Sequence, residues 1–211
     1  MNLGRIHYNR HFQKLEQLKE DLLGQDHRPQ IFLNIYSYDK NHKLYETKSL
    51  PAKSLVKGFL WRMFSQLQQT SVAEFILSVD NVPRQVGTTT FNMNFGAGDT
   101  SGIRVGSSNQ AVAITDNKLI AMIAHGIGSG QLNHSVHTHT QPFVIGNSVI
   151  SRTKRNFDNQ SGGNVTVREV GWIGDSITSG FLYERRVLPS DEVIPNTESR
   201  DFEYEFRISL T

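Results

Sequence analysis

The chain contains no cysteine in its 211 residues. This excludes a disulfide framework and any metal site built on thiolates. No apolar run reaches the roughly 18–20 residues that span a bilayer, and the first residues lack the apolar region of a signal peptide. Charges nearly cancel, with 22 Lys and Arg against 20 Asp and Glu. We therefore expect no membrane span, no signal-peptide export and no nucleic-acid partner, because nucleic-acid binding needs a basic surface.

Catalytic motifs are missing as well. Residues 126–130 read GIGSG, with serine in fourth place, whereas the nucleophile elbow G-x-S-x-G needs serine in third place. The glycine-rich stretch 96–106 lacks the Lys-Ser/Thr tail and the following helix of a phosphate-binding loop. We predict that the protein is not an enzyme, that it has no catalytic residues and that it takes no cofactor.

The first third of the chain alternates between helical and strand patterns. Apolar residues recur every three or four positions over 12–24, which predicts a helix that docks on the body or on a neighbouring subunit. Residues 31–38 and 43–48 read as the two strands of a hairpin. Residues 51–68 carry a wide apolar stripe at helical spacing and predict a packed helix, with Pro51 in its first turn.

From about residue 72 onward, short β-branched and aromatic runs alternate with Gly, Asn, Asp and Ser. The candidate strands are 74–79, 88–95, 102–105, 119–125, 131–140, 142–157, 165–172, 180–188 and 202–210. Strands at this spacing predict a mainly β fold, an antiparallel β-sandwich of immunoglobulin-like or jelly-roll-like type. We expect residues 1–70 to form a helix–hairpin–helix docking segment and 71–211 to form the sandwich body.

The last candidate strand alternates most regularly. Its apolar positions are Phe202, Tyr204, Phe206 and Ile208, and its polar positions are Glu203, Glu205 and Arg207. Because successive side chains of a strand point to opposite faces, the pattern predicts one face in the core and one face in water.

Three histidines in the segment LNHSVHTHTQP are candidate metal ligands. His137 and His139 lie two positions apart and would face the same way on a strand. Such a pair can bind zinc, or iron where three copies meet on a symmetry axis. His134 has the opposite parity, so one chain offers two ligands at most. The alternative, which we favour, is that these residues are polar positions on a solvated or intersubunit strand face, and we assign no metal site.

The segment RNFDNQSGGNVTVREVGW, residues 155–172, predicts two strands joined by a turn. A centred hairpin register would place Phe157 opposite Val165 and bring Arg155 diagonally near Glu169. We expect this ion pair to fix the register, with Arg186 as a competing partner for Glu169. These three charged residues, Arg155, Glu169 and Arg186, are the candidate structural and assembly residues.

Four blocks of sequence occur in a fixed order. They are AKSLVKGFL at 52–60, GIRVGSSNQAVAITDNKL with IAHGIGSGQLNH at 102–134, RNFDNQSGGNVTVREVGW at 155–172, and LYERRVL at 182–188. Together they resemble a family of structural proteins of tailed bacteriophage particles, over roughly residues 30–211. One departure is Gly58, where the family often has asparagine.

The resemblance implies a structural component of a phage virion, assembled in the host cytoplasm. We expect it to bind other virion proteins and to form a ring or another symmetric homo-oligomer, in the tail, neck or baseplate in preference to capsid decoration. The alternative is a receptor- or carbohydrate-binding β-sandwich of a phage. The two tryptophans, Trp61 and Trp172, argue against it, because they fall on a predicted buried helix and at a strand end.

Overall fold

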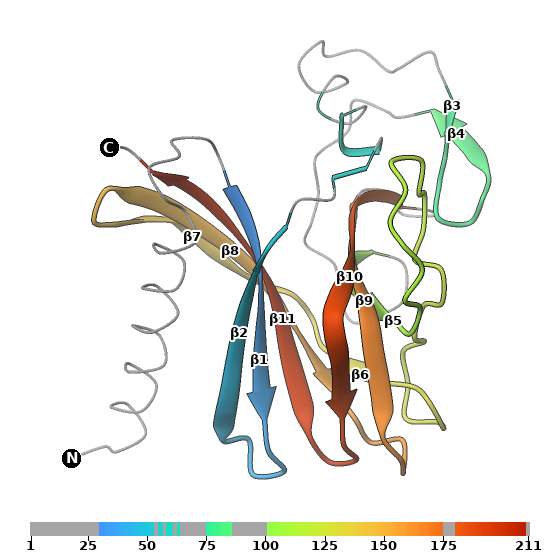
Figure 1. The fold of residues 1–211 in the computed structure, drawn as a ribbon, viewed down its shortest axis with the longest axis vertical. Coiled ribbons are helices and arrows are strands. Elements are labelled where there is room, and N and C mark those ends of the chain that lie inside the picture. The colour runs from blue at the N-terminus through green and yellow to red at the C-terminus, as the bar shows by residue number, and fades with distance from the viewer. Residues whose placement is uncertain are drawn as a thin grey trace.

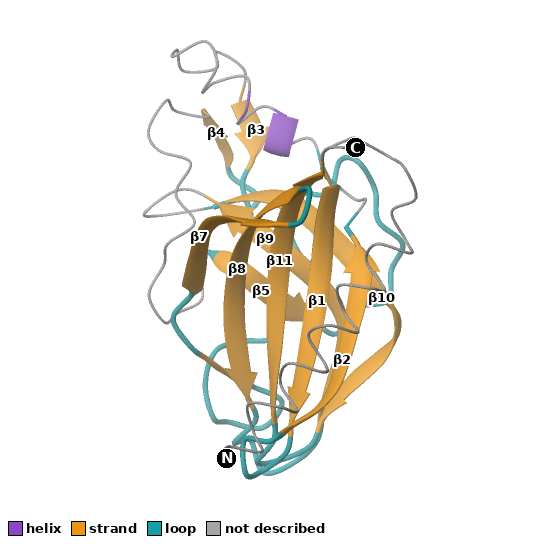
Figure 2. Ribbon diagram, turned by 90° about the vertical axis from the view of Figure 1, so that its left-hand side faces the viewer, coloured by secondary structure: helices purple, strands orange, loops and turns teal. Residues whose placement is uncertain are grey.

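The computed structural model describes residues 30–52, 55–56, 58–60, 63, 75–85, 101–174 and 180–209. These residues form two packed antiparallel sheets (Figures 1 and 2), which confirms the predicted β-sandwich. The helix expected over 12–24, the strand expected over 88–95 and most of the helix expected over 51–68 lie outside the described residues.

The larger sheet has the strand order β2-β1-β11-β8, and β8 continues it with β6 and β7 along its other edge. The strands are β1 (Gln30–Tyr38), β2 (Leu44–Pro51), β6 (Asn133–His134), β7 (Thr138–Ile145), β8 (Ser148–Asp158) and β11 (Ser199–Ser209). The smaller sheet has the order β10-β9-β5. Its strands are β5 (Gly102–Gly106), β9 (Val165–Gly174) and β10 (Phe181–Ile194), and a separate short hairpin joins β3 (Phe75–Leu77) to β4 (Pro83–Gln85).

The predicted hairpin near the start of the chain is confirmed, since β1 pairs antiparallel with β2. The same strand pairs along its whole length with β11. Leu33 and Ile35 of β1 face the core, while Asn34 between them faces the other side and bonds to Glu203. The hairpin is therefore part of the larger sheet.

The segment after β2 differs from the prediction. Pro51 ends β2 and does not begin a helix, because an outer strand tolerates a residue without an N–H group. Leu55 then forms an isolated antiparallel bridge with Glu184 of β10, and the Val56 N–H donates to the Tyr183 carbonyl at 2.9 Å. Helical residues among those described are 58–60 and 63.

Three further strand predictions need correction. Residues 131–140 are not one strand, because they contain β6 and the beginning of β7 with residues 135–137 between them. Residues 119–125 form no strand; Met122 and His125 each make one isolated bridge, and this segment lies along β5 through a bond from the Ile123 N–H to the Val105 carbonyl. Residues 142–157 are not one strand, because a turn with positive φ at Gly146 separates β7 from β8.

The core lies between the two sheets. Its buried apolar residues come from both of them, including Leu33, Phe157, Phe202 and Tyr204 of the larger sheet and Ile103, Val105, Val167, Val170 and Trp172 of the smaller sheet. Trp172 contacts the rings of Tyr183, Tyr204 and Phe206, with centroids 5.2–5.9 Å apart. Each fully buried side chain of this size contributes roughly 1.5–3 kcal/mol, so the aromatic cluster holds the layers together.

Asn159, in the loop after β8, ties the loops at one end of the sandwich together. Its amide Nδ2 donates to the carbonyls of Gly163 and Ile194 at 2.8 and 2.6 Å. Its Oδ1 accepts from the Ser161 backbone N–H at 3.0 Å. The loop between β8 and β9 is therefore bonded to the turn between β10 and β11.

We predict that Asn159→Ala lowers the free energy of unfolding by roughly 2–3 kcal/mol, because it removes a buried amide together with its bonds to the carbonyls of Gly163 and Ile194. Chemical denaturation measures the change. The matched control is Asn164→Ala in the same loop, where the side chain is exposed and the change should stay within about 0.5 kcal/mol. Equal stability of the two variants would contradict the role of Asn159.

Candidate functional site

The charged residues singled out in the sequence occupy different sheets from those expected. The strand that carries Arg155, β8, belongs to the larger sheet, and the strand that carries Glu169, β9, belongs to the smaller sheet. The predicted hairpin register is therefore wrong, and Glu169 pairs with Arg185 in place of Arg155 or Arg186. The loop between β8 and β9 crosses from one layer to the other, which the turn residues alone do not reveal.

Arg155 joins the two sheets at one edge of the sandwich. Its guanidinium is fully buried and donates to the carbonyls of Ile103 at 3.1 Å and Ser101 at 3.3 Å. It also donates to the Ser135 carbonyl at 2.9 Å. Since β5 is the outer strand of the smaller sheet, Arg155 satisfies carbonyls that the sheet itself leaves unpaired.

His137 completes the closure of the same edge. Its Nε2 accepts the Ile103 backbone N–H at 2.9 Å, so this nitrogen carries no proton. The imidazole lies against Gly102, whose φ is +86°, and a Cβ at that position would overlap the ring. Gly102 therefore serves two purposes: it adopts a left-handed backbone, and it leaves space for the histidine.

We predict that Gly102→Ala destabilises the protein by roughly 2–3 kcal/mol, since the new methyl adds left-handed strain and displaces His137. Gly163→Ala is the control, because a Cβ there meets nothing within 4 Å. Thermal and chemical denaturation of both variants provide the comparison. A Gly102 variant as stable as the Gly163 variant would show that His137 is not held in this position.

A buried ion network covers the outer face of the smaller sheet. The Arg185 and Glu169 side chains are fully buried and bond at 2.7 Å. Arg185 also pairs with Asp116 at 2.9 Å and donates to the Gln110 carbonyl at 2.8 Å. Glu169 accepts the backbone N–H of Ala121 at 2.8 Å. The network thus fastens the segment 110–121 onto β9 and β10, and its pairing is what makes burial of two charges tolerable.

Two contacts close the opposite edge of the sandwich. Arg186 of β10 donates to the carbonyl of Pro51 at the end of β2. Lys48 of β2 pairs with Glu192 of β10. Both contacts run from the larger sheet to the smaller one, so side chains join the layers along both edges.

Glu184 of β10 lies in the core and accepts a hydrogen bond from the Tyr204 hydroxyl. Its second oxygen, Oε1, is buried without a hydrogen-bond partner among the described residues. Burial raises the pKa of this carboxyl to about 8, although the Tyr204 bond and the charge of Arg186 act in the opposite direction. The group is therefore a carboxylic acid held largely uncharged near neutral pH.

We predict that Glu184→Gln abolishes one component of the pH dependence of stability. The folded-state pKa of about 8 lies above the ordinary value of 4.5. The stability that the neutral acid contributes is therefore complete below about pH 4.5 and is lost as the pH rises through about 8. The wild type should lose up to roughly 1.4 kcal/mol per pH unit relative to Glu184→Gln across this range. Denaturation from pH 5 to 9 measures the difference.

The control for this experiment is Glu46→Gln, which changes a carboxylate whose side chain is 45% exposed. This variant should follow the wild-type pH profile. Parallel profiles for wild type and Glu184→Gln would contradict an uncharged Glu184 in the folded protein.

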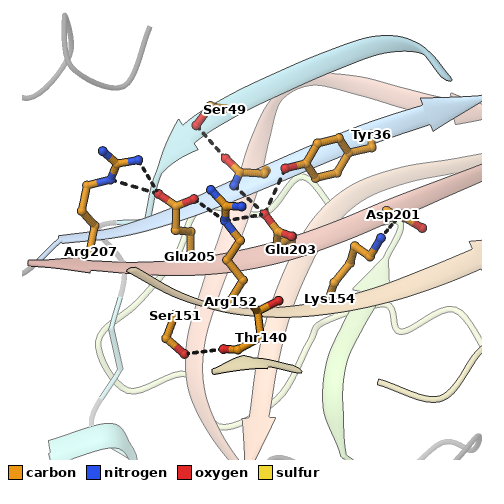
Figure 3. A network of polar contacts seen from close by, with 11 residues as sticks. Tyr36, Ser49, Thr140, Ser151, Arg152, Lys154, Asp201, Glu203, Glu205 and Arg207 are labelled. Atoms are coloured by element: carbon orange, nitrogen blue, oxygen red, sulfur yellow. Dashed lines mark hydrogen bonds and ion pairs between the residues drawn. The ribbon is translucent and has the colours of Figure 1, made fainter. Parts of the chain in front are cut away.

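The outer face of the larger sheet carries a second network of charges (Figure 3). Arg152 of β8 bonds to Glu205 of β11 at 2.8 Å, and Arg207 bonds to the same carboxylate at 3.1 Å. Glu203 accepts from the Asn34 amide at 2.9 Å and from the Tyr36 hydroxyl at 3.0 Å.

The predicted wet face of the last strand is therefore wrong. Glu203, Glu205 and Arg207 are all less than 9% exposed. The alternating pattern correctly identifies which residues share a face. It does not reveal that the Asn34 amide and the Tyr36 hydroxyl of β1, together with Arg152 of β8, complement the charges on β11. Burial raises the pKa of Glu203, while Asn34 and Arg152 lower it. Burial also opposes the charge on Arg152, but Glu205 and Glu203 outweigh it and raise the pKa of that guanidinium.

The histidine pair is held by protein contacts. The rings of His137 and His139 stack with centroids 6.2 Å apart. His137 bonds to Ile103, and Nδ1 of His139 lies 3.0 Å from the Thr153 hydroxyl. Within the described ranges, no group of three His, Asp or Glu side chains is arranged to hold a metal ion. No helix in the same ranges is long and apolar enough to cross a membrane.

These arrangements bind strands and loops to one another. Among the described residues, the buried charges are engaged in the sandwich: Arg155 caps β5, Arg185 holds a loop, and Arg152 spans β8 and β11. The sequence reasoning missed Arg185 and Glu184, although the charges within LYERRVL were a visible signal that this strand is not purely apolar. Comparison with known protein families, curated proteins and solved structures finds no match to the chain.

Proposed function

We propose that the protein is a structural component of a tailed-bacteriophage virion, assembling with itself and with other virion proteins. It is assembled in the host cytoplasm and acts without catalysis. The support from sequence is the ordered set of four blocks that resembles phage structural proteins.

One structural observation carries the proposal furthest. The charged residues of the blocks at 102–134, 155–172 and 182–188 serve the scaffold: Arg155 caps β5, Glu169 pairs with Arg185, and Asp116 holds the loop above them. A set of motifs devoted to stability fits a protein whose task is to keep its shape within an assembly. Arg155, Glu169 and Arg186 therefore serve assembly indirectly, by fixing the faces that the module presents.

A tail, neck or baseplate position remains favoured over capsid decoration. The alternative, a receptor- or carbohydrate-binding module, gains no support from the tryptophan that the structure describes. Trp172 is buried in the core, so its ring offers no surface on which a sugar could stack.

The test is quantitative mass spectrometry of particles purified from the phage that encodes the chain. We expect the protein in the particles, at a copy number on the order of ten for a ring in the tail or neck, because closed symmetric rings have few subunits. Hundreds of copies would assign it to capsid decoration. Its absence from particles, with abundant protein in the infected cell, would overturn the proposal.

A further inference from the structure

Three exposed apolar residues form a row across neighbouring strands. Val144 of β7 lies opposite Val149 of β8, and Val149 lies opposite Ile208 of β11. Directly opposed residues share a face of a sheet, and this face is the one that carries Tyr204 and Phe206 toward the core. The side chains are 71%, 42% and 51% exposed, respectively.

The row is exposed because the larger sheet extends past the smaller one. Figure 1 shows the two sheets diverging, with the β7–β8 hairpin directed away from β9 and β10. Phe206, two residues before Ile208, still packs against Trp172, with ring centroids 5.2 Å apart. The apolar face of the core therefore continues beyond the point where the second layer ends.

Among the residues that the structure describes, β7, at the end of this row, has a partner strand along one edge only. Within the described residues, β7 pairs with β8 on one side, and its residues are exposed from Thr138 to Gln141. The strand, THTQPFVI, carries no Lys, Arg, Asp or Glu, and burial lowers the pKa of its one histidine, His139. The strand at the other side of the sheet, β2, carries Glu46 and Lys48, the charges that ordinarily protect an edge strand from pairing.

We propose that β7 and the row of Val144, Val149 and Ile208 form a contact with the same surface of a second copy of this chain. The inference deepens the proposed function by naming the surface that self-assembly uses, and it rests on that function. A two-fold contact places the same strand of two copies side by side. Charged residues on that strand would face their own like charges in the other copy, whereas a strand without Lys, Arg, Asp or Glu avoids this repulsion. Pairing β7 with its copy continues the apolar row from one chain into the next.

The geometry limits how strong this contact is. Pro142 has no N–H group, and the register shifts between Thr140 and Phe143, so the stretch that can pair is the short one around Val144. Stable interfaces bury about 1,200–2,000 Å² in total, and a row of three residues from each chain is smaller than that. The contact is therefore weak and concentration-dependent in the isolated protein, and it is reinforced by neighbouring contacts in an assembly.

Sedimentation of the full chain over a concentration series up to roughly 1 mM tests the proposal. We expect the average mass of the wild type to rise toward that of a dimer. Val144→Lys should remain monomeric, because it places two like charges opposite each other. The matched control is Val193→Lys on β10, a strand valine that is 41% exposed, which should associate like the wild type. A monomeric wild type, or association of Val144→Lys equal to the wild type, would overturn the proposal.

A second variant uses the absence of cysteine from the chain. Val144→Cys should form a disulfide-linked dimer under a mild thiol oxidant, because opposed residues near a two-fold axis approach within disulfide distance. Val193→Cys reports random collision, and equal rates for the two variants would contradict the contact. Self-association with absence from virions would overturn the proposed function alone, whereas presence in virions with no β7 contact would overturn this inference alone.

Discussion

The structure depends on the bonds from the Arg155 guanidinium to the carbonyls of Ser101 and Ile103, at the start of β5. An antiparallel sandwich has outer strands whose backbone groups are unpaired, and it must satisfy them wherever they are buried. Here one side chain from the larger sheet supplies two donors to the edge of the smaller sheet. His137 supplies the complementary acceptor, and on the opposite edge Arg186 and Lys48 link the layers in the same manner.

Burying so many charges has a physical cost, which ion pairs and hydrogen bonds offset. Arg185 has two kinds of partner, the carboxylates of Glu169 and Asp116 and the backbone carbonyls of Gln110 and Ala111. The network specifies one geometry, because a shift of β9 or β10 along its axis would break several of these bonds at once. Such a network fixes the positions of the strands but tolerates few substitutions of its charged residues. This suits a module that must present constant surfaces to its neighbours.

The sequence was sufficient to predict most strands, because alternation and turn residues are local properties. The β1–β2 hairpin and the apolar face of β11 follow from them directly. The partners of each strand do not follow from local properties. For this reason the sequence predicts a pairing of Glu169 with Arg155, whereas the structure pairs Glu169 with Arg185. Residues 119–125 resemble a strand because Leu119 and Ile123 must be buried, yet burial against β5 requires only an irregular segment.

The pairing of β1 with β11 has a consequence for how the protein forms. The centre of the larger sheet joins Gln30 to Arg207 and Tyr38 to Ser199, residues at opposite ends of the described chain. Contacts so distant along the chain make folding slow, because a long loop must close before they form. On the ribosome, β1 and β2 emerge before β11, so one edge of β1 has no partner strand until β11 has been synthesised. The larger sheet is thus completed only after translation of its last strand, so its folding cannot proceed strand by strand from the N-terminus.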